Sequence, residues 1–136
     1  MSKYKFILEK QDKNARSGTI KTSLGEIKTP AFMPVATQGA IKSTPINIIE
    51  EIGYEMILSN TYHNILRPGL KIIREFTNLS KFMDWNKPIL TDSGGFQVMS
   101  LSKLRKITKK GVIFQSHIDG SSHELTPENV VETQNI

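Results

Sequence analysis

The stretch Pro88-Ile89-Leu90-Thr91-Asp92-Ser93-Gly94-Gly95-Phe96-Gln97 decides the fold. Its apolar start lies between a proline and turn residues, which predicts the end of a buried strand. Asp92 follows at once, so its carboxylate lies at the carboxyl edge of that strand, where ligands gather in parallel α/β folds. Gly94 and Gly95 let a flat ligand approach the backbone, and Phe96 offers a ring to stack on it. The stretch therefore predicts a nucleobase pocket.

The same residues have two other interpretations. Asp-Ser-Gly-Gly is a common turn, because Asp bonds to its own backbone and Gly accepts unusual φ angles. The motif alone does not separate a turn from a site. Asp-Ser-Gly-Gly also surrounds the nucleophilic serine of chymotrypsin-like proteases. However, Thr91 and Phe96 stand where those proteases have Gly and Pro, and Ser93 has no evident base partner, which argues against a protease.

Composition indicates one ordinary globular domain. The chain has 136 residues, of which 38% are hydrophobic and 23% charged, in the usual range. This is about half of the ~250 residues that a full eight-stranded α/β barrel needs. Cys is absent, which excludes disulfides and Cys-ligated zinc within these residues. With no long apolar run and no secretory signal, the sequence predicts a cytoplasmic protein without a membrane partner.

Basic residues gather in one part of the chain. The formal net charge is +5, and residues 93–118 contain five basic side chains and no acidic one. Such a cluster fits contacts with RNA phosphates, and it equally fits a solvated lysine-rich face. The candidate phosphate contacts are Lys103, Arg105, Lys106, Lys109 and Lys110.

The first half of the chain reads as a small sheet followed by a βαβ unit. Three short strands within residues 1–28 predict an antiparallel sheet. A strand at 29–36, a loop at 37–40, a helix capped by Thr44 and a buried strand at 56–60 follow in order. That order is typical of a right-handed parallel βαβ unit.

The second half adds a helix, a strand and two hairpins. Residues 69–76 are amphipathic, and the strand before Asp92 is the third parallel one. Hairpins are expected at 106–114 and 116–125, and a last helix starts at Thr126. We therefore predict an α/β fold with one incomplete domain over residues 1–136. Its parts are an antiparallel sheet at 1–28 and the first βα units, with inserted hairpins, at 29–136.

The histidines leave two interpretations open. His117 and Asp119 lie two residues apart on a predicted strand, so both point to one side. With His123 they would form a metal site, or all three are polar hairpin positions. His63 is either a pocket residue or a structural imidazole. We expect two further aromatic side chains to lie in the core: Tyr62 and Trp85.

Several long motifs together point to one family. They are Lys28–Val35, Ser59–His63 with Leu66–Gly69, Lys81–Trp85, Thr91–Gln97 and Ser116–Gly120. With these motifs in order, the whole chain resembles the N-terminal part of the tRNA-guanine transglycosylases. The resemblance implies a TIM-type (β/α)₈ barrel preceded by a small antiparallel sheet, of which this chain holds the first strands. It also implies a pentosyltransferase that exchanges wobble guanine in tRNA for a 7-deazaguanine, towards queuosine.

The resemblance also implies roles for individual residues. Asp92 would be the acid/base carboxylate of the base pocket, Ser93 would line that pocket, and Phe96 would stack on the base. Asn60 would sit beside the catalytic aspartates. Two apolar residues would pack near the ribose of the flipped nucleotide: Val35 and Leu58.

Other family features have no counterpart in these residues. They are the nucleophilic Asp, a second base-recognition Asp, and the zinc ligands, three Cys and one His. The chemistry needs the guanine out of its stack, one carboxylate that attacks C1′, and a second that moves a proton. This sequence supplies the second carboxylate only.

We therefore expect the 136 residues to be inactive alone and to need no cofactor, zinc belonging to the full-length family. Partners of the full-length family are tRNA and guanine or a 7-deazaguanine. For this chain we expect weak, non-specific RNA binding at most, and self-association through open sheet edges. The alternative is a non-catalytic RNA-binding or interaction module derived from such an enzyme.

Overall fold

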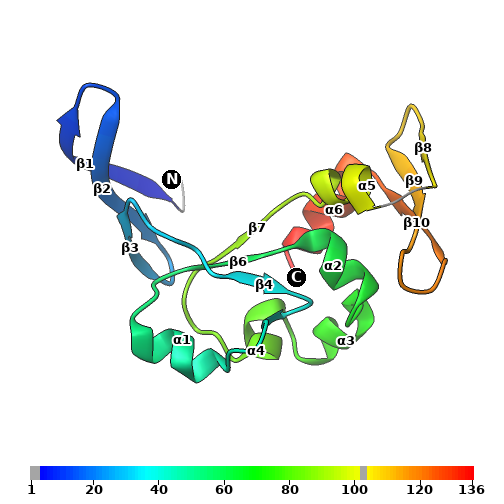
Figure 1. Ribbon diagram of the computed structural model, residues 1–136, viewed down its shortest axis with the longest axis horizontal. Helices are drawn as coiled ribbons and strands as arrows, with labels where there is room; N and C mark the ends of the chain where they lie inside the picture. The colour runs from blue at the N-terminus through cyan, green and yellow to red at the C-terminus, as the bar shows by residue number, and fades with distance from the viewer. Residues whose placement is uncertain (1–3, 102–103) are drawn as a thin grey trace.

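The computed structural model describes residues 4–101 and 104–136, which form three β-sheets and six helices. A mixed, mainly parallel sheet lies at the centre, and an antiparallel sheet lies at either end of the molecule (Figure 1). The chain is thus of the mixed α/β class, as the sequence predicts. Within the described ranges, no helix has the length and apolar character needed to cross a membrane.

The N-terminal sheet contains the three predicted strands in sequence order. They are β1 (Lys5–Asp12), β2 (Ala15–Thr22) and β3 (Gly25–Thr29), all paired antiparallel. Ile27 of β3 pairs with Ile20 and is 1% exposed. An exposed ion pair joins Lys21 to Glu26 at 2.8 Å, and it adds little because both side chains are solvated. Burial of Ile27 is therefore the stronger contribution to this sheet.

The central sheet confirms the predicted parallel βαβ unit. Strand β4 runs parallel to β6, and β6 runs parallel to β7, with α1 between β4 and β6. The predicted loop at 37–40 is instead a tight hairpin, because β5 pairs antiparallel with β4 around it. The elements are β4 (Val35–Thr37), β5 (Ala40–Ile41), α1 (Ile46–Ile52), β6 (Ile57–Ser59) and β7 (Ile89–Thr91).

Five further helices follow α1 along the chain. The sequence predicts α3 and α6, whereas α2, α4 and α5 are short and were not expected. Helix α6 begins with the predicted Thr126 cap, which forms a full capping box with Asn129. The Thr44 cap is wrong, since α1 has Pro45 before it and no side-chain cap. The helices are α2 (Thr61–Leu66), α3 (Leu70–Glu75), α4 (Leu79–Met83), α5 (Gly95–Leu101) and α6 (Pro127–Gln134).

Helices cover one face of the central sheet. Ile49 of α1 and Met83 of α4 pack with fully buried Trp85 on this face, together with Ala36 and Ile57 from the strands. Trp85 also donates from Nε1 to the Pro88 carbonyl at 3.1 Å. This confirms the predicted core position of Trp85.

The other face of the central sheet carries an apolar row. Val35, Leu58 and Leu90 are register partners on three neighbouring parallel strands. Val35 is 48% exposed and Leu90 is 37% exposed. The prediction that Leu90 is buried is therefore wrong, because helices cover only the opposite face.

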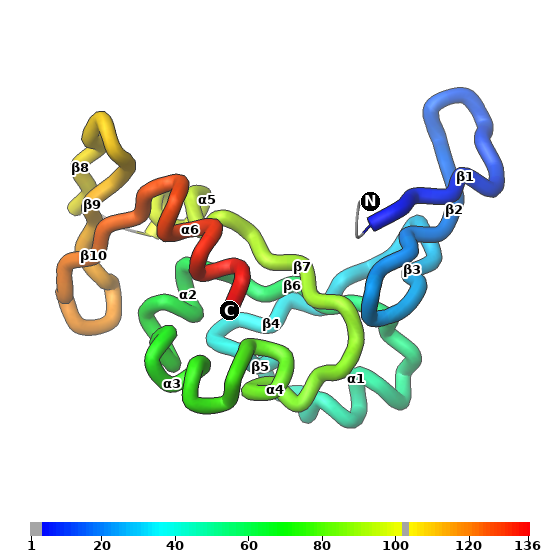
Figure 2. The backbone as a smooth tube through the Cα atoms, turned by 180° about the vertical axis from the view of Figure 1, so that it is seen from behind, coloured from blue at the N-terminus to red at the C-terminus, as the bar shows by residue number. Residues whose placement is uncertain are grey.

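The third sheet forms what we call the hairpin arm, residues 104–125. It consists of β8 (Arg105–Ile107), β9 (Val112–Gln115) and β10 (Ser122–Leu125). The predicted strand at 116–118 is wrong, since β9 ends at Gln115 and the chain turns. Figure 2 shows the arm and the N-terminal sheet at opposite ends of the molecule, with α6 beside the end of β7.

Candidate active site

Asp92 lies immediately after the parallel strand β7, at its carboxyl edge. Its backbone N–H donates to the Ser59 carbonyl at 3.3 Å, which continues the pairing of β7 with β6 by one residue. The residue is half-buried. Asn60 follows β6 in the same way, so the two polar residues meet at one edge of the sheet, as the sequence predicts.

The Asp92 carboxylate accepts four hydrogen bonds. Oδ1 accepts from the backbone N–H groups of Thr61 at 2.8 Å and Gly94 at 3.1 Å. Oδ2 accepts from Asn60 Nδ2 at 2.7 Å and Gln97 Nε2 at 2.9 Å. Four bonds use the acceptor capacity of an ionised carboxylate. Two donors are fixed backbone amides, and two are side-chain amides that rotate.

Gly94 allows this arrangement by its backbone conformation and its lack of a side chain. Its φ is +74°, in the left-handed region. A Cβ at this position would lie 3.0 Å from the Tyr62 backbone nitrogen and 3.1 Å from the Tyr62 Cβ. Glycine therefore lets α5 approach the start of α2 closely enough for both helices to contribute donors to Asp92.

The structure leaves Ser93 and Phe96 open to solvent. Ser93 Oγ accepts from the Gly95 N–H at 3.4 Å, and Phe96 is 79% exposed. Phe96 lies in the first turn of α5, next to Gln97, which donates to Asp92. The exposed ring of Phe96 thus lies next in sequence to Gln97, a hydrogen-bond donor to the Asp92 carboxylate.

The rings of Tyr62, His63 and His117 contact one another close to Asp92. Tyr62 is fully buried, which confirms its predicted core position, and its hydroxyl lies 2.8 Å from His117 Nδ1. The His63 and His117 rings meet edge to face at 6.0 Å. Burial and then the charge of His117 lower the pKa of His63, and the Asp92 charge opposes them. His63 is thus favoured in its neutral form beside the carboxylate.

The three candidate metal ligands do not converge. His117 contacts Tyr62, whereas Asp119 and His123 both bond to Ser121 Oγ, at 2.7 and 2.8 Å. Hydrogen bonds, first from the Ser121 hydroxyl and then from the Ser116 hydroxyl, lower the pKa of Asp119 to about 2. Within residues 4–101 and 104–136, no three His, Cys, Asp or Glu side chains lie together as metal ligands would. His117 and Asp119 are polar turn positions, and His123 lies on β10.

The basic cluster lies on the hairpin arm. Arg105 and Lys106 are exposed on β8, and Lys109 and Lys110 are exposed in the turn that follows. Thr108 orders this turn, because its Oγ1 accepts from the N–H groups of Lys110 and Gly111 at 3.2 and 3.1 Å. Lys103 lies outside the described residues.

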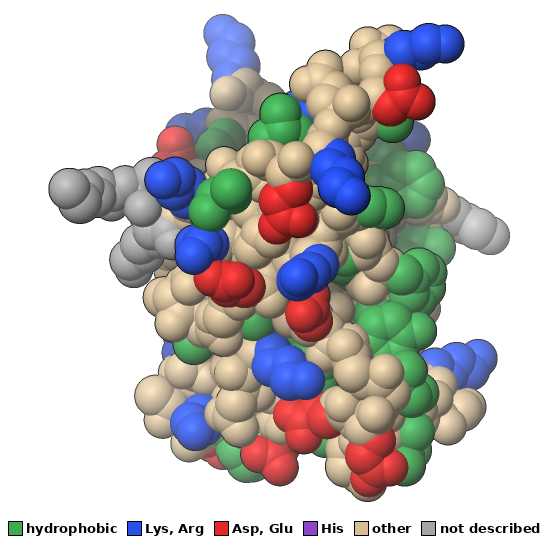
Figure 3. Space-filling view, turned by 90° about the vertical axis from the view of Figure 1, so that its left-hand side faces the viewer, with side chains coloured by type: hydrophobic (Ala, Val, Ile, Leu, Met, Phe, Trp, Pro, Cys, Tyr) green, Lys and Arg blue, Asp and Glu red, His purple; other side chains and the backbone are tan. Residues whose placement is uncertain are grey.

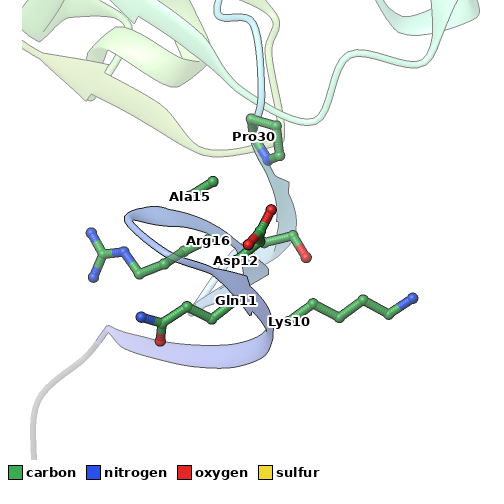
Figure 4. A pocket seen from close by; sticks show the side chains of 7 residues that line it. Lys10, Gln11, Asp12, Ala15, Arg16 and Pro30 are labelled. Atoms are coloured by element: carbon green, nitrogen blue, oxygen red, sulfur yellow. The ribbon is translucent and has the colours of Figure 1, made fainter.

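At the opposite end of the molecule, around the N-terminal sheet, neither sign of charge predominates on the surface that Figure 3 shows. On the side shown in Figure 3, basic and acidic side chains are interspersed. A pocket at the β1–β2 hairpin is lined by Lys10, Asp12 and Arg16, among others. Figure 4 shows the Lys10 and Arg16 side chains extending in opposite directions, so they do not converge on one ligand.

Comparison with known proteins gives consistent matches along the chain. The sequence model of the family described as Queuine tRNA-ribosyltransferase matches residues 11–136. Queuine tRNA-ribosyltransferase of Rickettsia felis is 54% identical over all 136 residues, which are 38% of that protein.

Two further relatives carry the same description. The protein of Rickettsia prowazekii is 55% identical over 98% of this chain and 37% of its own length. That of Thermoanaerobacter pseudethanolicus is 57% identical over 98% of this chain and 36% of its own length. The chain thus spans less than two fifths of the length of each of these relatives.

Proposed function

The chain belongs to the queuine tRNA-ribosyltransferase family, and we propose that it is the N-terminal part of an enzyme that exchanges wobble guanine in tRNA for a 7-deazaguanine. The observation that carries this proposal is the Asp92 carboxylate, held at the edge of a parallel sheet by Asn60, Thr61, Gly94 and Gln97. That edge is where parallel α/β folds place their reacting groups.

We propose that the central sheet is the start of a (β/α)₈ barrel. Its helices pack on one face only, through Ile49 and Met83. The opposite face presents the row Val35, Leu58 and Leu90, and inward side chains of this kind fill the interior of such barrels. Further parallel strands beyond β7 would close the barrel over this row.

Asp92 is the proton carrier in the proposed reaction. In its protonated form Asp92 gives a proton to the departing guanine, and the carboxylate that remains takes one from the incoming base, so the exchange neither gains nor loses protons. The ribose is held meanwhile by a second carboxylate, outside these 136 residues.

The four bonds to Asp92 set a condition on this proton transfer. The carboxylate has no acceptor site left while all four donors are in place. The amides of Thr61 and Gly94 belong to the backbone, so a base must displace the side-chain amide of Asn60 or Gln97. A base N–H then occupies the vacated oxygen, which puts the base within proton-transfer distance of Asp92.

The remaining candidate residues fit around this carboxylate. Phe96 presents its ring for stacking on the base, which must leave the tRNA stack to be reached. Ser93 lines the same pocket. Val35 and Leu58, neighbours on the uncovered sheet face, provide an apolar wall for the ribose.

The tRNA partner fits the hairpin arm. Arg105, Lys106, Lys109 and Lys110 are exposed there, and Lys103 belongs to the same cluster in the sequence. Contacts from lysine and arginine to phosphates carry no sequence information, so binding by these 136 residues alone is weak, non-specific and salt-dependent. This arm is also what favours the alternative function, an RNA-binding module without catalysis.

The experiment compares two proteins. One is the 136-residue chain, which should not incorporate labelled guanine into tRNA because it lacks the nucleophile. The other joins residues 1–136 to the part of the Rickettsia felis relative that follows its matched region, and this family-length chimera should exchange guanine.

In the chimera, Asp92→Ala should lower exchange by roughly 10²–10⁴-fold, the usual contribution of a positioned acid/base. Ser93→Ala should weaken it only partly. Exchange by the 136-residue chain above a buffer control, or a chimera indifferent to Asp92→Ala, would refute the proposal.

A further inference from the structure

Gln134, in the last turn of α6, reaches the backbone of the site from 42 residues away in the sequence. Its Nε2 donates to the Asp92 carbonyl at 3.0 Å, to the Thr91 carbonyl at 3.1 Å and to the Thr91 hydroxyl at 3.2 Å. The amide has two hydrogens, which the three oxygens share. One side chain thus bridges the last residue of β7 and Asp92.

The Asp92 carbonyl is held from two sides. Thr61 Oγ1 donates to the same oxygen, and the Thr61 N–H donates to the carboxylate. Helix α2 and helix α6 therefore meet at the backbone of Asp92. Because φ, ψ and χ1 of this residue decide where its carboxylate points, fixing the carbonyl limits the directions that the carboxylate takes.

Helix α6 is itself fixed at both ends. At its start, the Thr126–Asn129 capping box is present and Asn129 Nδ2 donates to the Glu124 carbonyl at 2.8 Å. After its end, the Ile136 carbonyl accepts from the Leu79 N–H at 3.2 Å. Val130 packs against the cluster that contains Tyr62. The Gln134 amide is thus presented by a rigid element.

We propose that Gln134 is a positioning residue for Asp92: it holds the end of β7 so that the carboxylate keeps its orientation towards the base. This inference rests on the proposed function, because it assigns Gln134 a part in the same reaction. Gln134 does not touch the reacting atoms. Its effect passes through the backbone of Thr91 and Asp92.

The test uses the family-length chimera with two variants of Gln134 and one control. Gln134→Ala removes the donor. Gln134→Glu keeps the shape but sets a carboxylate against the two carbonyl oxygens of Thr91 and Asp92, so it should be the worse of the two. Glu132→Ala, an exposed position on the same helix, is the matched control.

We expect kcat at saturating tRNA to fall about fivefold to tenfold in Gln134→Ala and further in Gln134→Glu, the scale of one or two lost hydrogen bonds. KM for guanine should stay within about twofold, since the base contacts remain. Backbone hydrogen exchange of the peptide containing Asp92 should become faster in both variants and stay unchanged in Glu132→Ala.

Each outcome separates the inference from the proposed function. If Asp92→Ala abolishes exchange while Gln134→Glu has the wild-type kcat and wild-type hydrogen exchange, the positioning role is wrong and the function stands. If Gln134→Glu matches wild type and only Gln134→Ala loses activity, the side chain acts by filling space, which also refutes the inference. If Asp92→Ala leaves exchange intact, the function itself fails.

Discussion

Two aspartates, each with a glycine of φ +74° one or two residues further on, have contrasting hydrogen-bond partners. Asp92 precedes Gly94 at the strand edge, and three of its four carboxylate donors come from residues 5 to 32 positions away. Asp119 precedes Gly120 in the turn of the hairpin arm, and its carboxylate bonds to Ser121, two residues away.

The difference lies in what each carboxylate depends on. The Asp119 bonds need only a local turn, of the kind that Asp forms in many loops. The Asp92 bonds form only where β6, β7, α2 and α5 meet, so they depend on the tertiary packing of the chain. The Asp92 carboxylate, whose donors lie in or directly before α2 and α5, is the one that we assign to the reaction.

We expect the largest difference between the two sites when the glycine after each aspartate, Gly94 or Gly120, is changed to alanine. Gly94→Ala adds left-handed strain and a Cβ 3.0 Å from the Tyr62 nitrogen, so it should cost roughly 2–4 kcal/mol of unfolding free energy. Gly120→Ala has the same φ but no atom within 4 Å of the new Cβ, so it should cost about 1 kcal/mol. Urea unfolding of both variants measures this. Equal losses would mean that Gly94 is only a turn glycine.

A triple change on the arm should have the next largest effect. Lys106, Lys109 and Lys110 changed together to Glu should lower tRNA affinity about tenfold or more at 0.1 M salt. With three to four phosphate contacts, log affinity should fall with log salt at a slope of roughly −2 to −4.

The N-terminal sheet supplies the control for the arm. Lys10, Lys13 and Lys28 are exposed, and changing them to Glu alters the net charge equally. Filter binding or fluorescence anisotropy with unmodified tRNA compares the two triple variants. If both lose the same affinity, the arm has no special part and net charge alone explains the binding.

The smallest expected effect is a pH dependence confined to the arm. The pKa of Asp119 is lowered from 3.8 to about 2, so its stabilising bonds are fully present above about pH 4. They are lost as the pH falls towards 2, when the carboxylate takes up its proton. In Ser121→Ala the pKa should rise towards 3.8, as a carboxyl NMR titration would show. An unchanged midpoint would assign the shift to another donor.

The meeting of Asn60 and Asp92 is predictable from the sequence. Both residues follow short apolar runs, and parallel strands bring their carboxyl ends to one edge. A glycine at position 94 is likewise recognisable from the Asp-Ser-Gly-Gly motif, although the motif does not reveal the contact with Tyr62.

The sequence does not predict the remaining hydrogen-bond donors to Asp92, and the reason is physical. Thr61 and Gln97 lie on helices of six and seven residues, which are too short to show a clear 3.6-residue period. Gln134 was expected on a helix, but nothing local indicates a bond to a strand end 42 residues earlier. Such pairings depend on how α6 packs.

The error at His117 and Asp119 has a local cause. Ser116 Oγ accepts from the N–H groups of Ile118 and Asp119 at 3.1 and 3.4 Å. This turn replaces the strand on which His117 and Asp119 were expected to share a face. Serine competes with a β-ladder for backbone donors in this way.

The most direct test of the account is guanine exchange by the family-length chimera carrying Asp92→Asn or, separately, Asp119→Asn. Both changes remove one carboxylate and keep its size. Single-turnover incorporation of labelled guanine at saturating tRNA excludes differences in binding. The account predicts a loss of at least about 100-fold for Asp92→Asn and a rate within about twofold of wild type for Asp119→Asn. Comparable rates for Asp92→Asn and wild type would contradict the assignment of the strand-edge carboxylate to the reaction.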